Sequence, residues 1–154
     1  MATTGKLEVE VQVKSQVDKF WETVKDSAAI FPKAFPQDYK SIEILEGDGK
    51  SVGSVRHITY GEGSPIVKTS KERIEALDDA KKALSYSVIE GDLLKYFKIF
   101  KAHMILEPKK DDTGTLVKWW CEYEKASHEV ADPEVIKDFA LKNFQEVDAY
   151  IHKA

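Results

Sequence analysis

The chain has 154 residues, of which 42% are hydrophobic and 32% charged, and this length and composition predict one soluble globular domain over residues 1–154. Asp and Glu (27) outnumber Lys and Arg (23), and the formal net charge of -4 provides no overall positive field for a phosphate backbone, so no nucleic-acid partner is expected. Cys121 is the only cysteine, which excludes internal disulfide bonds and multi-thiolate metal sites and indicates a reducing, cytoplasmic location.

A strand and two short helices are predicted at the start of the chain. From residue 6 to residue 14, apolar side chains alternate with polar ones, the period of two that indicates a half-buried strand. Ser15 and Asp18 then match a capping box, in which each side chain satisfies a free backbone amide, so a helix is predicted to begin there. Pro32 and Pro36 keep the second helix short, because proline lacks an amide hydrogen and clashes inside a helix.

Six further strands are predicted after Pro36, divided by clusters of glycine or acidic residues. Their approximate spans are 39–45, 52–60, 67–77, 83–90, 94–106 and 115–125. The connections between them are too short for parallel crossovers, which need roughly a dozen residues or more. The sheet is therefore expected to be an antiparallel meander.

A long amphipathic helix is predicted at the C-terminal end. Asp132 is expected to cap it, and Pro133 suits its first position because no amide hydrogen is needed there. An apolar stripe then runs through Val135, Ile136, Phe139, Ala140, Phe144, Val147, Tyr150 and Ile151. A helix of about 20 residues is about 30 Å long, enough to cross a small domain. The predicted fold class is α+β, with a twisted seven-stranded sheet curled around this helix.

Five stretches of the chain, taken in order, carry a resemblance to a known family. They are Leu7-Glu8-Val9-Glu10-Val11, Phe31-Pro32-Lys33-Ala34-Phe35-Pro36, the glycine loop from Glu46 to Arg56, Tyr86-Ser87-Val88-Ile89-Glu90-Gly91-Asp92, and Glu122-Tyr123-Glu124-Lys125 with the terminal helix. Over the whole chain they resemble the major latex protein-like branch of the plant Bet v 1 superfamily. The resemblance implies a helix-grip fold with an internal cavity that takes small hydrophobic or amphipathic molecules.

Strand alternation groups the side chains that could face the last helix. On the strand predicted from 94 to 106 both sides carry apolar residues, so alternation alone leaves its orientation open; the resemblance places Tyr96, Lys98 and Phe100 inward. The side chains expected to line the cavity are Phe31, Arg56, Ile58, Tyr60, Glu72, Leu84, Tyr86, Val88, Tyr96, Lys98, Phe100, Trp119, Cys121, Tyr123, Ile136, Phe139, Ala140 and Asn143. Composition alone also allows a packed core, and the resemblance favours a cavity.

Neither a metal ion nor another cofactor is expected. No metal-ligand spacing joins the four histidines, which are His57, His103, His128 and His152. Gly49-Lys50-Ser51 runs into a predicted strand instead of opening a helix, so the glycine loop is interpreted as a hairpin and not as a phosphate cradle. Cys121 lies among apolar neighbours without an adjacent base, which favours a small buried hydrophobe over a nucleophile.

The first function hypothesis is a carrier for small hydrophobic or amphipathic plant metabolites, of lipid, steroid, phenolic or hormone-like type, linked to defence or development. The alternative is a cavity enzyme, because the resemblance implies that some relatives catalyse cyclisation or condensation of reactive terpenoid or alkaloid intermediates. The acid and base would then be Lys98 with Tyr60, Tyr96 or Glu72.

A small ligand is the one partner predicted, for a monomer or a weak dimer. No membrane span is expected, because no apolar run approaches the roughly 20 residues that a span needs, and the first residues lack the apolar run of a signal peptide. A hormone receptor like those for abscisic acid is disfavoured, since residues 61–66 and 90–94 lack the gate and latch sequences of those receptors.

Overall fold

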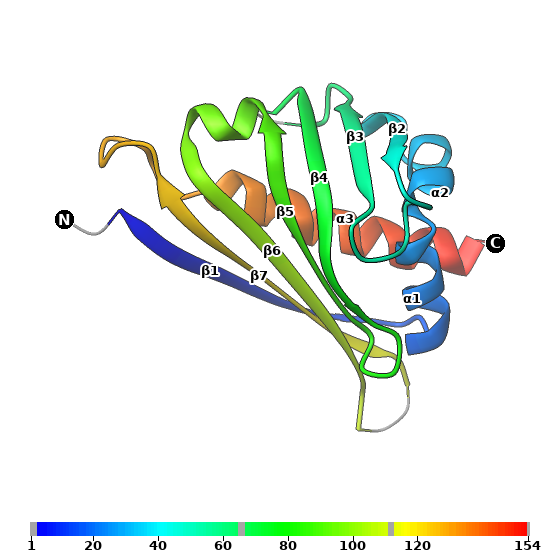
Figure 1. Cartoon of the computed structure of the whole chain (residues 1–154). Coiled ribbons are helices and arrows are strands. Elements are labelled where there is room, and N and C mark those ends of the chain that lie inside the picture. The colour runs from blue at the N-terminus through cyan, green and yellow to red at the C-terminus, as the bar shows by residue number, and fades with distance from the viewer. Residues whose placement is uncertain (1–2, 65–66, 111–112, 154) are drawn as a thin grey trace.

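Seven antiparallel strands form one curved sheet, and a long helix lies across its concave face (Figure 1). The computed structural model describes residues 3–64, 67–110 and 113–153. The elements are β1 (Thr4–Val13), α1 (Val17–Lys25), α2 (Ser27–Ala34), β2 (Tyr39–Glu46), β3 (Val55–Tyr60), β4 (Thr69–Asp78), β5 (Ala83–Gly91), the 3-10 turn η1 (Asp92–Lys95), β6 (Phe97–Pro108), β7 (Thr115–Lys125) and α3 (Glu134–Lys153). The expected α+β helix-grip architecture is confirmed.

The strand order across the sheet is β1-β7-β6-β5-β4-β3-β2. From β2 to β7 every strand pairs with its neighbour in sequence, as a meander requires, and β1 pairs with β7 from residue 4 to residue 13. The helices α1 and α2 carry the chain from β1 at one edge to β2 at the other (Figure 1). They therefore close one end of the concave face.

The glycine loop joins β2 to β3, which confirms the hairpin interpretation. Asp48 holds the turn, since its carboxylate accepts the amide hydrogens of Lys50 and Ser51, both at 2.8 Å. These hydrogen bonds lower the pKa of Asp48 to about 2. Gly47 and Gly49 adopt φ angles of 76° and 82°, which glycine accepts without steric cost. Of the other expected connections, Pro65, Ile66 and Asp111-Asp112 lie outside the described residues.

The interior between α1, α3 and the strands β1 and β7 is closely packed. The helix α3 packs directly on β1 and β7 and against α1. Its Val147 is 1% exposed, and the ring of Phe144 lies 6.3 Å from that of the fully buried Phe20. Trp21 of α1 is also buried and donates its indole N–H to Asp79 at 2.8 Å. This apolar packing supplies the stabilising core of the domain.

Both helix caps predicted from local sequence are wrong, because tertiary contacts take the capping side chains. Ser15 donates its hydroxyl to Asp148 of α3 at 2.5 Å, and Gln16 occupies the N-cap position of α1 without a side-chain hydrogen bond. Asp132 instead accepts the hydroxyl of Tyr123 at 2.8 Å and pairs with Lys125 at 2.9 Å. The helix α3 begins two residues later, at Glu134.

A buried carboxylate fixes the middle of α3. Asp38 is 1% exposed in the turn between α2 and β2, and Lys142 of α3 donates to it at 3.0 Å. Gly63 packs so closely here that a Cβ atom would lie 2.4 Å from an oxygen of Asp38.

Burial, together with the neighbouring Asp38 carboxylate, raises the pKa of Glu146 to about 7, although Lys142 opposes this shift.

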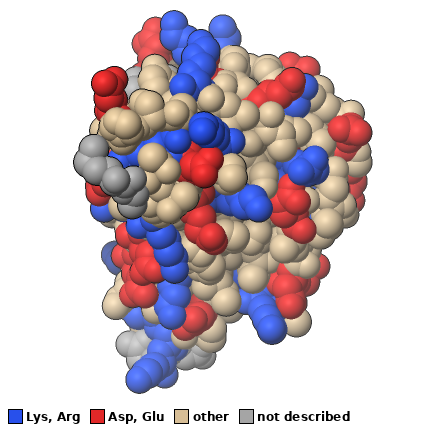
Figure 2. Space-filling view, turned by 60° about the vertical axis from the view of Figure 1, so that its left-hand side comes forward, with Lys and Arg blue, Asp and Glu red and all other residues tan. Residues whose placement is uncertain are grey.

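The surface carries charges of both signs. On the face shown in Figure 2, Lys and Arg side chains lie beside Asp and Glu side chains. Pairs such as Lys118 with Glu107 at 3.0 Å are partly exposed, and water screens their attraction, so they add little to stability. Within the described ranges no helix is long and apolar enough to cross a membrane.

We expect the free energy of unfolding to decline from about pH 5 to pH 8 through Glu146. A carboxyl group with a raised pKa binds its proton more tightly in the folded state, so its contribution is complete below the unfolded pKa of about 4.3 and is lost as the pH rises through about 7. Urea unfolding of the wild type and of Glu146→Gln at several pH values tests this. The free energy of unfolding should decline less with pH in the variant than in the wild type. Glu134→Gln is an exposed change on the same helix, and its free energy of unfolding should decline with pH as in the wild type. Equal declines in all three proteins would contradict the assignment.

Candidate ligand-binding cavity

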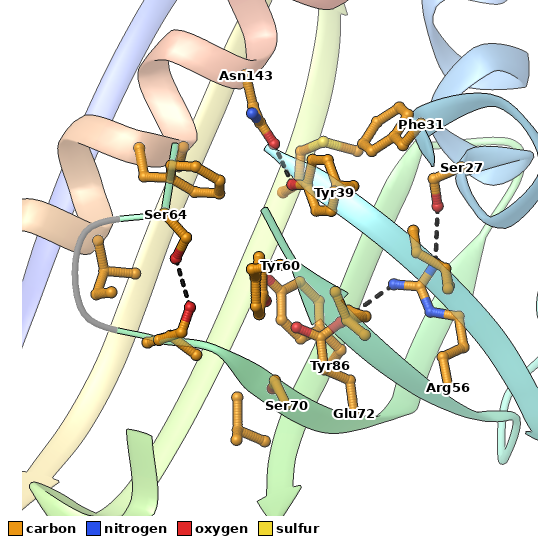
Figure 3. A pocket seen from close by; sticks show the side chains of 18 of the residues that line it. Ser27, Phe31, Tyr39, Arg56, Tyr60, Ser64, Ser70, Glu72, Tyr86 and Asn143 are labelled. Atoms are coloured by element: carbon orange, nitrogen blue, oxygen red, sulfur yellow. Dashed lines mark hydrogen bonds and ion pairs between the residues drawn. The ribbon is translucent and has the colours of Figure 1, made fainter. Parts of the chain in front are cut away.

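A cavity of about 150 Å³ lies between the concave face of the sheet and α3 (Figure 3). Its walls are mostly apolar. They are formed by Val24, Phe31, Ile42, Ile58, Val67, Leu84, Val88, Leu93, Phe100, Met104, Trp119, Ile136, Phe139, Ala140, Phe144 and Val147. The polar side chains that border it are Ser27, Tyr39, Arg56, Tyr60, Ser64, Ser70, Glu72, Tyr86 and Asn143.

Most of the side chains that were expected to line the cavity do border it, and four do not. Those in place are Phe31, Arg56, Ile58, Tyr60, Glu72, Leu84, Tyr86, Val88, Phe100, Trp119, Ile136, Phe139, Ala140 and Asn143. They come from distant parts of the chain, and the curvature of the sheet together with α3 brings them to one space. That these side chains bind a ligand stays a prediction, and the geometry is compatible with it.

Two expected residues point outward: Lys98 because β6 begins with an irregularity, and Tyr96 because it lies before the strand. The register with β7 shifts between Phe97 and Ile99, so the alternation breaks at Lys98. Phe97 is buried, Lys98 is exposed, and alternation resumes with Phe100 inward. Tyr96 lies before the strand, at the end of the 3-10 turn, and is 43% exposed. The inward placement of Tyr96 and Lys98 is therefore wrong, and a β-bulge of this kind reorients side chains without changing the strand count.

Two further expected residues face inward but do not reach the cavity. Cys121 and Tyr123 lie on β7 and are buried, but neither borders the cavity. Cys121 is fully buried, and burial raises the pKa of its thiol to about 11, which keeps it protonated and unreactive. The ring of Tyr123 packs 5.5 Å from that of Phe97. Burial and the hydrogen bond to Asp132 raise the Tyr123 pKa to about 12.

A buried ion pair is the main polar feature of the cavity wall. Arg56 of β3 and Glu72 of β4 are directly opposite in register and lie 3.2 Å apart. Arg56 also donates to the Ser27 hydroxyl of α2 at 2.7 Å (Figure 3). Burial raises the pKa of Glu72, and the Arg56 guanidinium opposes that shift. The pair thus ties two strands to α2 at the edge of the hollow.

Tyrosine hydroxyls supply the remaining polar groups on the sheet side. Tyr39 donates to the side-chain oxygen of Asn143 on α3, as Figure 3 shows. Burial raises the pKa of Tyr39, Tyr60 and Tyr86 well above the ordinary tyrosine range, and the Glu72 charge adds to it. All three rings therefore remain neutral and can act as hydrogen-bond donors. The side-chain nitrogen of Asn143 has no partner among the described residues.

Several lining residues were missing from the expectation. Ser70 lies two residues before Glu72 on β4, so strand alternation could have identified it. Met104 likewise shares the inward side of Phe100. Tyr39 gave no comparable signal, because its contact with Asn143 joins residues 104 positions apart. The described residues contain no group of three His, Cys, Asp or Glu side chains that could hold a metal ion.

Comparison with known proteins places this geometry in a family. Residues 2–154 match the model of the Pathogenesis-related protein Bet v 1 family. The chain is 56% identical over 153 residues to MLP-like protein 423 of Arabidopsis thaliana, covering 99% of this chain and 97% of that relative. It is 41% identical over 126 residues to Ribonuclease 1 of Panax ginseng, covering 79% and 80%. It spans only 47% and 44% of two further Arabidopsis relatives.

Solved structures agree on the fold. The crystal structure of ginseng major latex-like protein 151 from Panax ginseng matches with a TM-score of 0.88 at 30% identity, over 97% of this chain and 98% of that chain. Norcoclaurine synthase from Thalictrum flavum matches with a TM-score of 0.74 at 18% identity, over 97% and 87%, which establishes a shared fold alone. The chain thus belongs to the Bet v 1 family, and within it to the major latex protein-like proteins.

Proposed function

We propose that this protein is a cytoplasmic carrier for small hydrophobic or amphipathic plant metabolites. The observation that carries the proposal is the hollow between the sheet and α3, which has apolar walls and a few polar groups. Sites for small molecules combine apolar walls that supply affinity with few polar groups that fix orientation. Membership of the Bet v 1 family supports ligand binding in general.

The proposed ligands are lipid, steroid, phenolic or hormone-like compounds. Their affinity would come from removing carbon surface from water, about 25 cal/mol per Å². A dry apolar cavity of about 150 Å³ holds one benzene ring. A larger ligand therefore requires α3 or the lining rings to move outward from the positions described. The pathogenesis-related family supports a role in defence, and a developmental role is the alternative.

A cavity enzyme is the second candidate function. The observation in its favour is Glu72, a buried carboxyl group with a raised pKa that borders the cavity beside tyrosine hydroxyls. Lys98, the expected partner in acid–base chemistry, is exposed and outside the cavity. Norcoclaurine synthase shares the fold at low identity, which supports the alternative only at the level of the scaffold. A carrier needs no such acid–base pair, so the geometry supports it better.

An uncharged fluorescent probe should bind at one internal site. We expect N-phenyl-1-naphthylamine to show saturable fluorescence enhancement with one site per chain, because a ring system can bury its surface between sheet and helix. Ala140→Phe should abolish binding, since the added ring would fill space beside α3. Lys98→Met should bind the probe like the wild type, because Lys98 is outside the cavity.

Circular dichroism and urea unfolding would first establish that both variants are folded. Undiminished binding to folded Ala140→Phe would place the probe elsewhere. No saturable binding to the wild type would refute the carrier proposal.

Phe139 should contribute less to stability than Phe20, which is fully buried and does not border the cavity. Phe139 contacts Tyr39 and Tyr60 with ring centroids 6.0 Å apart in each case, and it borders the cavity, where part of its surface touches no atoms. Phe20→Ala should cost about 3–5 kcal/mol, and Phe139→Ala clearly less. Urea denaturation measures both, and an equal or larger cost for Phe139→Ala would indicate that the cavity wall is fully packed.

A further inference from the structure

The cavity contains very little charge. Among the described residues that border it, Arg56 and Glu72 are the ones that are charged. The two side chains are 11% and 7% exposed, and they meet at 3.2 Å (Figure 3). A charged ligand would therefore enter a space in which the one cation is already neutralised.

The charge of the Arg56 guanidinium is already paired. One terminal nitrogen donates to Ser27 at 2.7 Å and the other to Glu72 at 3.2 Å. The buried Nε–H has no partner among the described residues, and each terminal nitrogen keeps one further N–H. A carboxylate in the cavity would therefore meet a cation whose charge Glu72 already balances.

The carboxylate of Glu72 can still accept hydrogen bonds. Apart from Arg56, the described residues offer it no hydrogen-bond donor. Because an ionised carboxylate only accepts hydrogen bonds, a ligand hydroxyl would complete its coordination. The hydroxyl of Ser70, on the same side of β4, has no partner among the described residues and can also bond to such a group.

At three tyrosines that border the cavity, the charge of Glu72 acts more strongly than that of Arg56. At Tyr60 and Tyr86 the Glu72 charge raises the pKa more than the Arg56 charge lowers it. The same order holds at Tyr39, next to Asp38. Negative charge is therefore disfavoured on the side of the hollow where these three rings lie.

We propose that the cavity selects uncharged amphipathic molecules that carry a hydroxyl group and excludes carboxylates of the same size, because Glu72 neutralises Arg56 and faces the ligand as a hydrogen-bond acceptor. This selectivity rests on the proposed carrier function and narrows its ligand class. Fatty alcohols, sterols and neutral phenolics fit the rule. Ionised fatty acids and other organic acids do not.

A matched pair of ligands tests the selectivity. At pH 8, 1-decanol and decanoate have similar carbon chains and differ in charge. Displacement of N-phenyl-1-naphthylamine gives both affinities against one uncharged probe. We expect the wild type to bind decanol at least about tenfold more tightly, and a tenfold ratio corresponds to about 1.4 kcal/mol. Equal binding, or tighter binding of decanoate, would overturn the inference.

The variant Glu72→Gln should remove the preference for decanol. It keeps a side-chain oxygen for Arg56 but removes the negative charge, so the guanidinium becomes available to an anion. The ratio of decanol to decanoate affinity should fall by at least about tenfold, with decanoate binding more tightly than to the wild type. Glu75→Gln removes the same charge from an exposed position on the same strand and should leave the ratio unchanged.

A double variant keeps the selectivity test usable if Glu72→Gln does not fold. Glu72→Gln leaves Arg56 as a buried cation without its partner, which can destabilise the fold. Arg56→Met combined with Glu72→Leu removes both charges, and its ratio should lie below that of the wild type. A ratio equal to the wild type in the double variant, or in folded Glu72→Gln, would show that the ion pair does not set selectivity. Failure of the probe to bind wild type at all would instead refute the carrier function.

Discussion

The position of α3 on the concave face of the sheet is the constraint on which the rest of the structure depends. Polar contacts fix the helix along its length. Asp148 near its C-terminal end accepts the Ser15 hydroxyl, and Lys142 in its middle pairs with the buried Asp38. The helix also packs on β1 and β7. Because the sheet curves away from that support, a hollow remains beside β3, β4 and β5.

This arrangement lowers the stability that the chain could reach. A void leaves its lining atoms without contacts, and at about 24 cal/mol per Å³ a cavity of about 150 Å³ corresponds to about 4 kcal/mol. The Arg56–Glu72 pair adds a desolvation cost that apolar residues would avoid. Core features that reduce stability fit a site whose function requires space and fixed polar groups.

The distribution of ionisable groups inside and outside the hollow separates the two candidate functions. A carboxylate with a raised pKa lies inside, and the lysine that would complete an acid–base pair lies outside. The tyrosines around Glu72 remain protonated, so they can donate hydrogen bonds without transferring protons near neutral pH. Such a set of donors and acceptors can orient a ligand, and its net charge is neutral because Arg56 balances Glu72.

The sequence by itself determined the secondary structure, the antiparallel pairing and the fold class. These features follow from local patterns: side chains alternate along strands, proline limits the second helix, and short polar connections permit only antiparallel neighbours. Alternation also grouped Arg56 with Ile58 and Tyr60 on one side of their strand, and all three border the cavity. Major latex protein-like features over the whole chain added the expectation of a cavity.

Only the tertiary structure decided which inward side chains meet open space. The register shift at the start of β6 turned Lys98 outward, and alternation alone does not reveal such a shift. Cys121 has the expected inward orientation, but it is fully buried and does not border the cavity. The capping positions of Ser15 and Asp132 changed for the same reason, because partners distant in sequence compete for the same polar groups. Local patterns determine which way a side chain points, whereas the distance to the opposite wall depends on how the whole chain packs.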